Sequence, residues 1–395
     1  MEKSTIKDGF AVIPEGTTQI VEGAYEGCTN LTSVVIPDTA TYIGHSAFLG
    51  CTGLTKVIIP DSVMSIGDTA FSGCTNLASI IIPESVIQIG LGAFAGCTSL
   101  KSITIPYLVT TIRQSTFVGC TSLTRVVIPN SVMEIERDAF KGCTGLTSVF
   151  IPYSVMRLSG EAFKGCKNLI HIEVDKNSNC YESFDNCNAV LAKFVNSKLY
   201  NLVAGCATTV IPDTVAVIGS YAFCDCTSLT SIVIPSSVLD IGPYAFSGCT
   251  EFSSIVIPDS VKKIWYYAFS GCKGLTSVII PESVSVIQFH AFSYCTGLTD
   301  IVIPNSVTKI EYGTFMGCTG LTSIVIPDSV TKIEKLAFCD CTSLGSIAIP
   351  DTVTVIEKNA FKGCTGLKVI NVPTHKKEYF KQLLPEDLHN LIVEL

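Results

Sequence analysis

Cysteine and histidine are the side chains of this 395-residue chain that could bind a metal or act as nucleophile and base. The five histidines share no metal-ligand spacing, and the chain has neither a phosphate-binding glycine loop nor a nucleophile–base constellation. They are His45, His171, His290, His375 and His389. We therefore expect no catalytic residue, no cofactor and no metal site, and a protein that is not an enzyme.

The cysteines follow a fixed interval instead of a metal motif. Fourteen of the 19 recur every 23 residues in two blocks. They are Cys28, Cys51, Cys74, Cys97, Cys120, Cys143 and Cys166, then Cys226, Cys249, Cys272, Cys295, Cys318, Cys341 and Cys364. Ile-Pro or Val-Pro steps keep the same interval from Pro14 to Pro152 and from Pro212 to Pro373. A fixed period of this length predicts a solenoid of stacked repeats.

Each repeat contains three kinds of segment. Leu-x-x-Ile-x-Ile alternates with period two and predicts a short strand, which the following proline ends. Val-x-x-Ile reads as a second inward-facing segment, and Gly-x-x-Ala-Phe-x-Gly-Cys as a helical or 3₁₀ turn too short for a stable helix. Leu, Ile, Ile, Val, Ile, Ala, Phe and Cys should therefore face inward in every repeat, and stability should come from stacking.

The repeated cysteines are expected to be buried free thiols. Stacked strands lie ~4.8 Å apart, but parallel Cβ vectors are poor geometry for a disulfide. Cys224-Asp225-Cys226 and Cys339-Asp340-Cys341 suggest a zinc site, yet they are five periods, or ~24 Å, apart and cannot share four ligands. We interpret the additional Cys224 and Cys339 as residues that occupy a variable, outward-facing position of the repeat by chance.

The recurring pattern resembles a known family. Leu54, Val57, Ile59, Pro60 and the segment from Val63 to Cys74 carry Leu-x-x-Ile-x-Ile-Pro-x-x-Val-x-x-Ile-Gly-x-x-Ala-Phe-x-x-Cys, which closely resembles the BspA-like (treponemal-type) leucine-rich repeat. The resemblance covers roughly residues 9–373. It implies a right-handed, curved repeat solenoid in which short strands form a parallel β-sheet joined by short helical or 3₁₀ turns. It also implies a bacterial repeat protein of a kind often found on cell surfaces and described as an adhesin.

The interval divides the chain into parts. Residues 1–8 are a polar lead-in, 9–373 the solenoid, and 374–395 a helical C-terminal cap. A longer, variant repeat at about 167–211 carries an expected hairpin around Asn196-Ser197. This repeat is either a modified rung or a dedicated binding insertion.

Composition limits the partners and leaves the compartment open. The net charge is −8, only 15% of residues are charged and no Lys/Arg run occurs, so we expect no nucleic-acid partner. No apolar run approaches the ~18 residues of a membrane span. The N-terminal residues contain no secretory signal. The family resemblance favours a cell-surface or secreted protein, whereas the absent signal is compatible with the cytoplasm.

Two surfaces are candidates for binding. Outward strand positions form an apolar stripe, which either binds a partner or simply reflects β-propensity. The stripe residues are Val35, Ile58, Ile81, Thr104, Val127 and Phe150, then Val233, Val256, Ile279, Val302, Val325 and Ala348. Later repeats also carry clustered aromatics before Ala-Phe, which either bind a partner or are ordinary repeat residues. They are Tyr221, Tyr244, Trp265, Tyr266, Tyr267, Phe289, His290 and Tyr312.

These surfaces lead to two functional hypotheses. The first is a non-enzymatic module that binds a protein or glycan ligand, acting as a surface adhesin-type interaction protein. The alternative is a structural protein that self-assembles, for instance as a homodimer, through the apolar face of its sheet.

Overall fold

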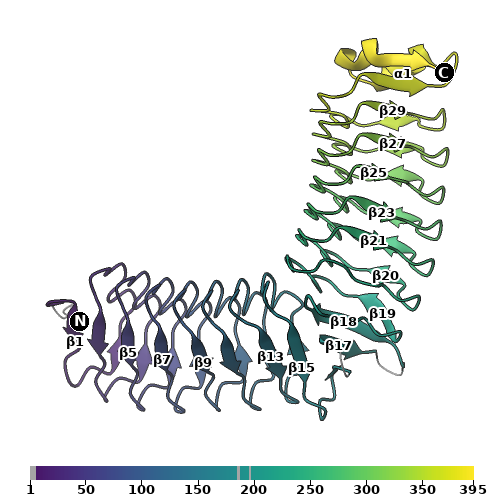
Figure 1. The fold of residues 1–395 in the computed structure, drawn as a ribbon. Helices are drawn as coiled ribbons and strands as arrows, with labels where there is room; N and C mark the ends of the chain where they lie inside the picture. The colour runs from purple at the N-terminus through teal and green to yellow at the C-terminus, as the bar shows by residue number, and fades with distance from the viewer. Residues whose placement is uncertain (1–5, 185–186, 195–196) are drawn as a thin grey trace. The chain divides into compact units, whose positions relative to one another are not determined.

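The computed structural model describes residues 6–184, 187–194 and 197–395, in two compact units of stacked turns (Figure 1). The first unit comprises Met1–Lys193 and Val203–Thr208, and the second Phe194–Leu202 and Thr209–Leu395. Most of the expected polar lead-in and Asn196 of the expected hairpin turn lie outside the described residues.

The first unit contains two columns of short parallel strands. Strands of the first column pair in a 23-residue register, for example Phe10 with Ser33. This column comprises β1 (Phe10–Val12), β3 (Ser33–Val35), β5 (Lys56–Ile58), β7 (Ser79–Ile81), β9 (Ser102–Thr104), β11 (Arg125–Val127), β13 (Ser148–Ile151) and β15 (His171–Val174). The second column comprises β2 (Gln19–Ile20), β4 (Tyr42–Ile43), β6 (Ser65–Ile66), β8 (Gln88–Ile89), β10 (Thr111–Ile112), β12 (Glu134–Ile135) and β14 (Arg157–Leu158). Each Val-x-x-Ile segment is thus a second strand.

The variant repeat departs from this parallel arrangement. Its β16 (Tyr181–Glu182) pairs antiparallel with β17 (Ala189–Lys193). The Tyr181 hydroxyl accepts a hydrogen bond from the Leu158 backbone N–H at 2.8 Å, so the variant repeat is tied to the rung before it.

The second unit repeats the two columns. Its first column comprises β21 (Ser254–Val256), β23 (Ser277–Ile279), β25 (Asp300–Ile301), β27 (Ser323–Val325), β29 (Ser346–Ala348) and β31 (Val369–Val372). Its second column comprises β19 (Val215–Ile218), β20 (Asp240–Ile241), β22 (Lys263–Ile264), β24 (Val286–Ile287), β26 (Lys309–Ile310), β28 (Lys332–Ile333) and β30 (Val355–Ile356), together with residues 200–202 of β18 (Tyr200–Gly205).

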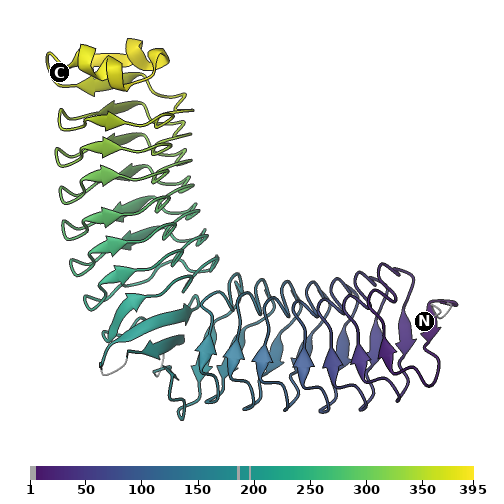
Figure 2. The same cartoon turned by 180° about the vertical axis from the view of Figure 1, so that it is seen from behind.

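The C-terminal residues cover the last rung of the second unit. They form α1 (Lys377–Leu383), the 3₁₀ helix η1 (Glu386–Leu391) and β32 (Ile392–Glu394), which pairs parallel with β31. Figure 2 shows the two helices lying across the end of this stack. Phe380 is fully buried there, so the last apolar rung is shielded from water.

The Ala-Phe segment is a run of turns in which backbone N–H groups alternate between two kinds of partner. Phe48 N donates to Ala70 O of the next rung at 2.8 Å, and Leu49 N donates to Ser46 O within its own turn at 3.0 Å. Gly50 N again donates to the next rung, at Ser72 O. Consecutive rungs are therefore hydrogen-bonded along this side as well as along both strand columns.

Phenylalanines form a stacked column in the core of each unit. From Phe48 to Phe163 neighbouring ring centroids lie 5.2–5.7 Å apart with nearly parallel planes. The column from Phe223 to Phe361 has spacings of 5.1–6.0 Å. The expected inward positions are confirmed; for example, Leu54, Val63, Ile66 and Phe71 are fully buried.

The repeated cysteines are free thiols, and most of them hydrogen-bond between rungs; Cys28, in the first rung, is only partly buried. Cys74 Sγ donates to Phe48 O at 3.2 Å, and Cys318 Sγ donates to Phe292 O at 3.1 Å. Burial raises the pKa of the Cys74 thiol from 9.0 to about 12, so it stays protonated and unreactive at neutral pH. The outward interpretation of Cys224 and Cys339 was wrong, because both side chains are buried.

Three rungs carry a side chain where the others have glycine before the repeated cysteine. Asp225, Tyr294 and Asp340 adopt φ values of 55°, 58° and 60° there. Each side chain lies over a glycine of the next rung. A Cβ added to Gly317 would stand 2.5 Å from Tyr294 Cδ1, and one on Gly248 or Gly363 would meet an aspartate carboxylate. A side chain at this position thus requires glycine one rung later.

Candidate interaction surfaces

The apolar stripe faces solvent in both units. Ile81 is 80% exposed, because the inward central residue of β7 leaves its neighbours pointing outward. Val233, which lies outside the named strands, is 83% exposed. The proposed binding residues Val127 and Phe150 lie on the stripe of the first unit, and Val256 and Ile279 on that of the second. The stripe therefore forms one ordered row within each unit.

The aromatic group of the second unit is a set of mutually stacked rings. It comprises Tyr221, Tyr244, Trp265, Tyr266, Tyr267, Phe289, His290 and Tyr312. Tyr221, Tyr244, Tyr267 and His290 form one column with centroid spacings of 4.7–4.8 Å. Tyr266 stacks on Phe289 at 4.9 Å in a second column. The two columns meet edge to face, so the sequence prediction that these aromatics cluster is correct.

His290 differs from its expected exposure. It is only 8% exposed, because Tyr267 covers one ring face and Gly313, which lacks a side chain, lies directly beneath the ring. Burial lowers the pKa of His290. The imidazole therefore ends the column as a neutral ring rather than offering a surface charge.

The first aromatic column requires an unfavourable backbone conformation. Tyr221, Tyr244 and Tyr267 have φ values of 62°, 54° and 56°, in the left-handed region that disfavours bulky side chains. Other rungs place smaller residues at the same position, such as Gly92 and Asn359 with φ values of 57° and 65°. The turn itself therefore does not require tyrosine.

Acceptor side chains from the following rung fix the backbone at Tyr266 and Tyr312. Gln288 Oε1 accepts the Tyr266 N–H at 3.2 Å, and Glu334 Oε2 accepts the Tyr312 N–H at 3.0 Å. Lys263 lies beside this group, with its Nζ 3.6 Å from the Trp265 ring centroid. These contacts hold the aromatic residues in a defined arrangement before any ligand arrives.

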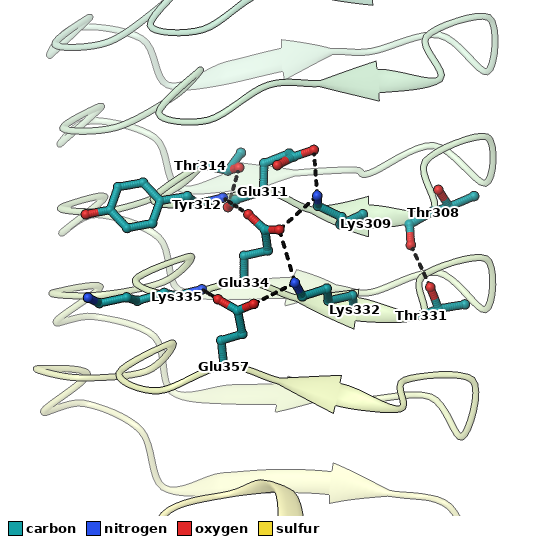
Figure 3. Close-up of polar contacts among 10 residues, drawn as sticks. All are labelled: Thr308, Lys309, Glu311, Tyr312, Thr314, Thr331, Lys332, Glu334, Lys335 and Glu357. Carbon is teal, nitrogen blue, oxygen red and sulfur yellow. Dashed lines mark hydrogen bonds and ion pairs between the residues drawn. The ribbon is translucent and has the colours of Figure 1, made fainter.

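A ladder of ion pairs runs beside Tyr312, whose ring points away from it (Figure 3). Lys309 Nζ lies 2.8 Å from Glu334 Oε1, and Lys332 Nζ lies 3.3 Å from the same oxygen and 2.5 Å from Glu357 Oε1. Burial acts to raise the pKa of Glu334, but the hydrogen bonds and charges of the two lysines outweigh it and lower that pKa. The carboxylate is therefore ionised at neutral pH and bridges two rungs.

A polar pocket interrupts the surface of the first unit and was not predicted from the sequence. Phe150 of β13 lines it together with His171 and Glu173 of β15, and Phe150 pairs with Glu173 in the strand register. The pocket has a volume of about 640 Å³. Its lining also includes Asp175, Lys176, Asn177, Ser183, Phe184 and Asn188. These residues come from separate segments of the variant repeat, so no local motif marks the pocket.

Neither surface nor the pocket presents a recognisable catalytic arrangement. Among residues 6–184, 187–194 and 197–395, no group of three or more His, Cys, Asp or Glu side chains could hold a metal ion. No helix in the described part of the chain is long and apolar enough to cross a membrane. The arrangement offers exposed apolar, aromatic and polar contacts, which is the chemistry of binding.

Comparison with known proteins identifies the repeat. The chain matches the family model described as "BspA type Leucine rich repeat region (6 copies)" over residues 9–124, 88–203, 193–321 and 286–384. No curated protein matches it.

Solved bacterial structures have similar folds. A leucine rich cell surface protein from Faecalibacterium prausnitzii A2-165 is 33% identical over 94% of this chain and 89% of that one, with a TM-score of 0.59. A leucine-rich repeat protein from Bacteroides ovatus ATCC 8483 is 28% identical over 98% and 92%, with a TM-score of 0.53. One from Eubacterium ventriosum ATCC 27560, at 24% identity over 91% of each chain and a TM-score of 0.64, shares the fold. The expected fold class, a repeat solenoid of short parallel strands, is confirmed.

Proposed function

This chain belongs to the BspA-type leucine-rich repeat family, and we propose that it is a non-enzymatic binding module that engages a protein partner at a cell surface. Its primary contact is the aromatic group, and the apolar stripe of the second unit extends the contact. The name of the Faecalibacterium relative, a cell surface protein, is consistent with this location.

The strained tyrosine column is the observation that supports this proposal best. A non-glycine residue in a left-handed conformation costs ~1 kcal/mol or more, and the rungs with Gly92 and Asn359 show that the turn forms without tyrosine. Folding alone therefore does not explain the Tyr221, Tyr244 and Tyr267 rings. Tyrosine and tryptophan are the residues most enriched at the centres of protein interfaces.

Ring stacking favours a protein over a glycan at this surface. A sugar packs against an open aromatic face, but the faces of Tyr244 and Tyr267 are covered by the rings on either side. What the columns leave accessible are ring edges and hydroxyl groups. These suit apolar side chains and backbone carbonyls of a protein partner.

Residues found at the same positions of other rungs provide substitutions that the repeat already tolerates. We would combine Trp265→Gln, Tyr266→Lys and Tyr267→Asn, because Gln288, Lys335 and Asn359 occupy the same three positions elsewhere. The matched control makes the same replacements in the first unit, as Arg113→Gln, Gln114→Lys and Ser115→Asn. Both variants should fold like the wild type by circular dichroism.

The assay screens the purified chain against arrayed ectodomains of surface proteins and measures each hit by biolayer interferometry. We expect the second-unit variant to weaken binding at least tenfold, which is about 1.4 kcal/mol, and the control to bind normally. Equal affinity for both variants and the wild type would refute the proposed surface.

Self-assembly is the second candidate, because Val233, Val256, Ile279, Val302 and Val325 form an exposed apolar row at the spacing of the repeat itself. A second copy could align its identical row against this one. Light scattering over a hundredfold concentration range would detect a dimer. The self-assembly function requires that Val256→Asp with Ile279→Asp abolish that dimer.

A further inference from the structure

The variant repeat replaces the apolar stripe with a polar pocket. From β1 to β13 the residues of the stripe are apolar or threonine, and Phe150 is the last of them. In β15 the same position of the row is occupied by Glu173, the register partner of Phe150. In the neighbouring outward row His171 follows Ser148. The change of residue type coincides with the pocket of about 640 Å³, which Phe150 and Glu173 both line.

The pocket combines aromatic rings with hydrogen-bonding groups. Phe150 and Phe184 are 44% and 39% exposed and provide apolar surface. Glu173, Asp175 and Asn188 provide carboxylate and amide oxygens that can each bind neighbouring hydroxyls. An apolar wall with a few convergent polar groups is typical of a small-molecule site. A pyranose is complementary to such a pocket, because its C–H face can pack against the aromatic rings and its hydroxyls can hydrogen-bond to the polar groups.

Internal hydrogen bonds hold the polar groups in place. His171 Nδ1 lies 3.0 Å from Asn188 Oδ1, and Asn188 Nδ2 donates to Thr208 Oγ1 at 3.1 Å. With Asn188 Oδ1 as the acceptor, His171 carries a proton on Nδ1. Its Nε2 lies 3.8 Å from the carboxylate oxygen Oε2 of Glu173. A ligand hydroxyl can donate a hydrogen bond to this carboxylate.

Charge selects among sugars. Two carboxylates, Glu173 and Asp175, face one ammonium group, that of Lys176, so the pocket has an excess of negative charge. Sialic and uronic acids would be repelled. We infer that this pocket binds a neutral pyranose, as the terminal or side unit of a glycan. The inference concerns a different unit from the aromatic group and holds or fails independently of the proposed protein partner.

Saturation-transfer NMR with methyl glycosides tests the inference on the full chain. The probes are the methyl glycosides of glucose, galactose, mannose, N-acetylglucosamine and N-acetylgalactosamine, with methyl glucuronide and sialic acid as anionic comparisons. We expect transfer to at least one neutral glycoside and none to the anionic probes. Failure of every neutral glycoside, or preference for an anionic one, would overturn the inference.

Two substitutions remove ligand contacts without disturbing the backbone. Glu173→Gln keeps the shape of an exposed side chain, and Asn188→Gly removes the amide at a position whose φ of 49° glycine adopts freely. Each should weaken binding of the neutral glycoside about tenfold. Glu15→Gln alters an exposed carboxylate of the first unit that does not line the pocket, and it should leave binding unchanged. Equal binding by Glu173→Gln, Asn188→Gly and the wild type would place the sugar elsewhere and refute the site.

Discussion

Phe269→Ala should be among the most destabilising single changes in the second unit. The Phe269 side chain is fully buried, and its ring lies 5.3 Å from the centroids of both Phe246 and Phe292. Truncating a buried phenylalanine to alanine costs about 3–5 kcal/mol. Because two stacked contacts are lost and each is worth about 0.5–1.5 kcal/mol, we expect a value in the upper half of the first range.

The chain provides its own reporter for this experiment. Its single tryptophan, Trp265, lies four residues before Phe269 in the same rung. Urea unfolding followed by tryptophan fluorescence therefore reports the rung that is changed, and circular dichroism reports the whole chain. Since repeat arrays can lose cooperativity, the slope of the transition must be compared as well as its midpoint.

An outward residue gives the control. Ile279 is exposed on the stripe of the same unit, so Ile279→Ala should cost less than about 1 kcal/mol. A loss below about 1 kcal/mol for Phe269→Ala itself would mean that the phenylalanine column is not the core of the stack.

Three further predictions concern single contacts. Buried thiols such as Cys74, with a pKa raised from 9.0 to about 12, hold protons that the unfolded chain releases, so the urea midpoint should fall as pH rises from about 9 to 12. Glu334→Gln should cost about 1 kcal/mol at low salt and less in 1 M salt. Since lysines lower the Glu334 pKa, the wild-type contribution is present above the ordinary carboxyl range and lost as pH falls through the folded pKa, and the variant should lack this part of the acid dependence. Gly317→Ala should cost about 1–3 kcal/mol in thermal unfolding, more than Gly119→Ala, whose added Cβ would meet nothing closer than 4.0 Å.

The 23-residue interval predicts the inward and outward positions because equivalent residues of successive rungs pack in equivalent surroundings. Ile66 and Phe71 could be placed in the core from their position alone. The left-handed backbone of Tyr267 was not predicted, because a tyrosine does not indicate that conformation; the signal lay in Gly92 and Asn359, which occupy the same position in other rungs.

Residues outside the interval account for most of what the sequence did not reveal. His171 and Asn188 are 17 residues apart in the variant repeat, and their contact depends on how that segment turns back on the rungs before it. His290 looked like an exposed aromatic because its burial depends on Gly313, one rung further on. Periodic contacts can be read from a single repeat, whereas these contacts require the folded chain.

Near-identical rungs create a danger of misalignment during folding. A stack displaced by one or more whole periods would keep almost every core contact, because Phe, Ile and Cys recur at each level. The side chains of Tyr294 and Asp340 restrict this degeneracy, since each fits only above a rung with glycine, as at Gly317 and Gly363. Stacking the Tyr294 rung directly on the Asp340 rung would drive a ring into a Cβ. These irregular rungs thus act as register markers, because they disfavour some of the stackings in which rungs are displaced by whole periods.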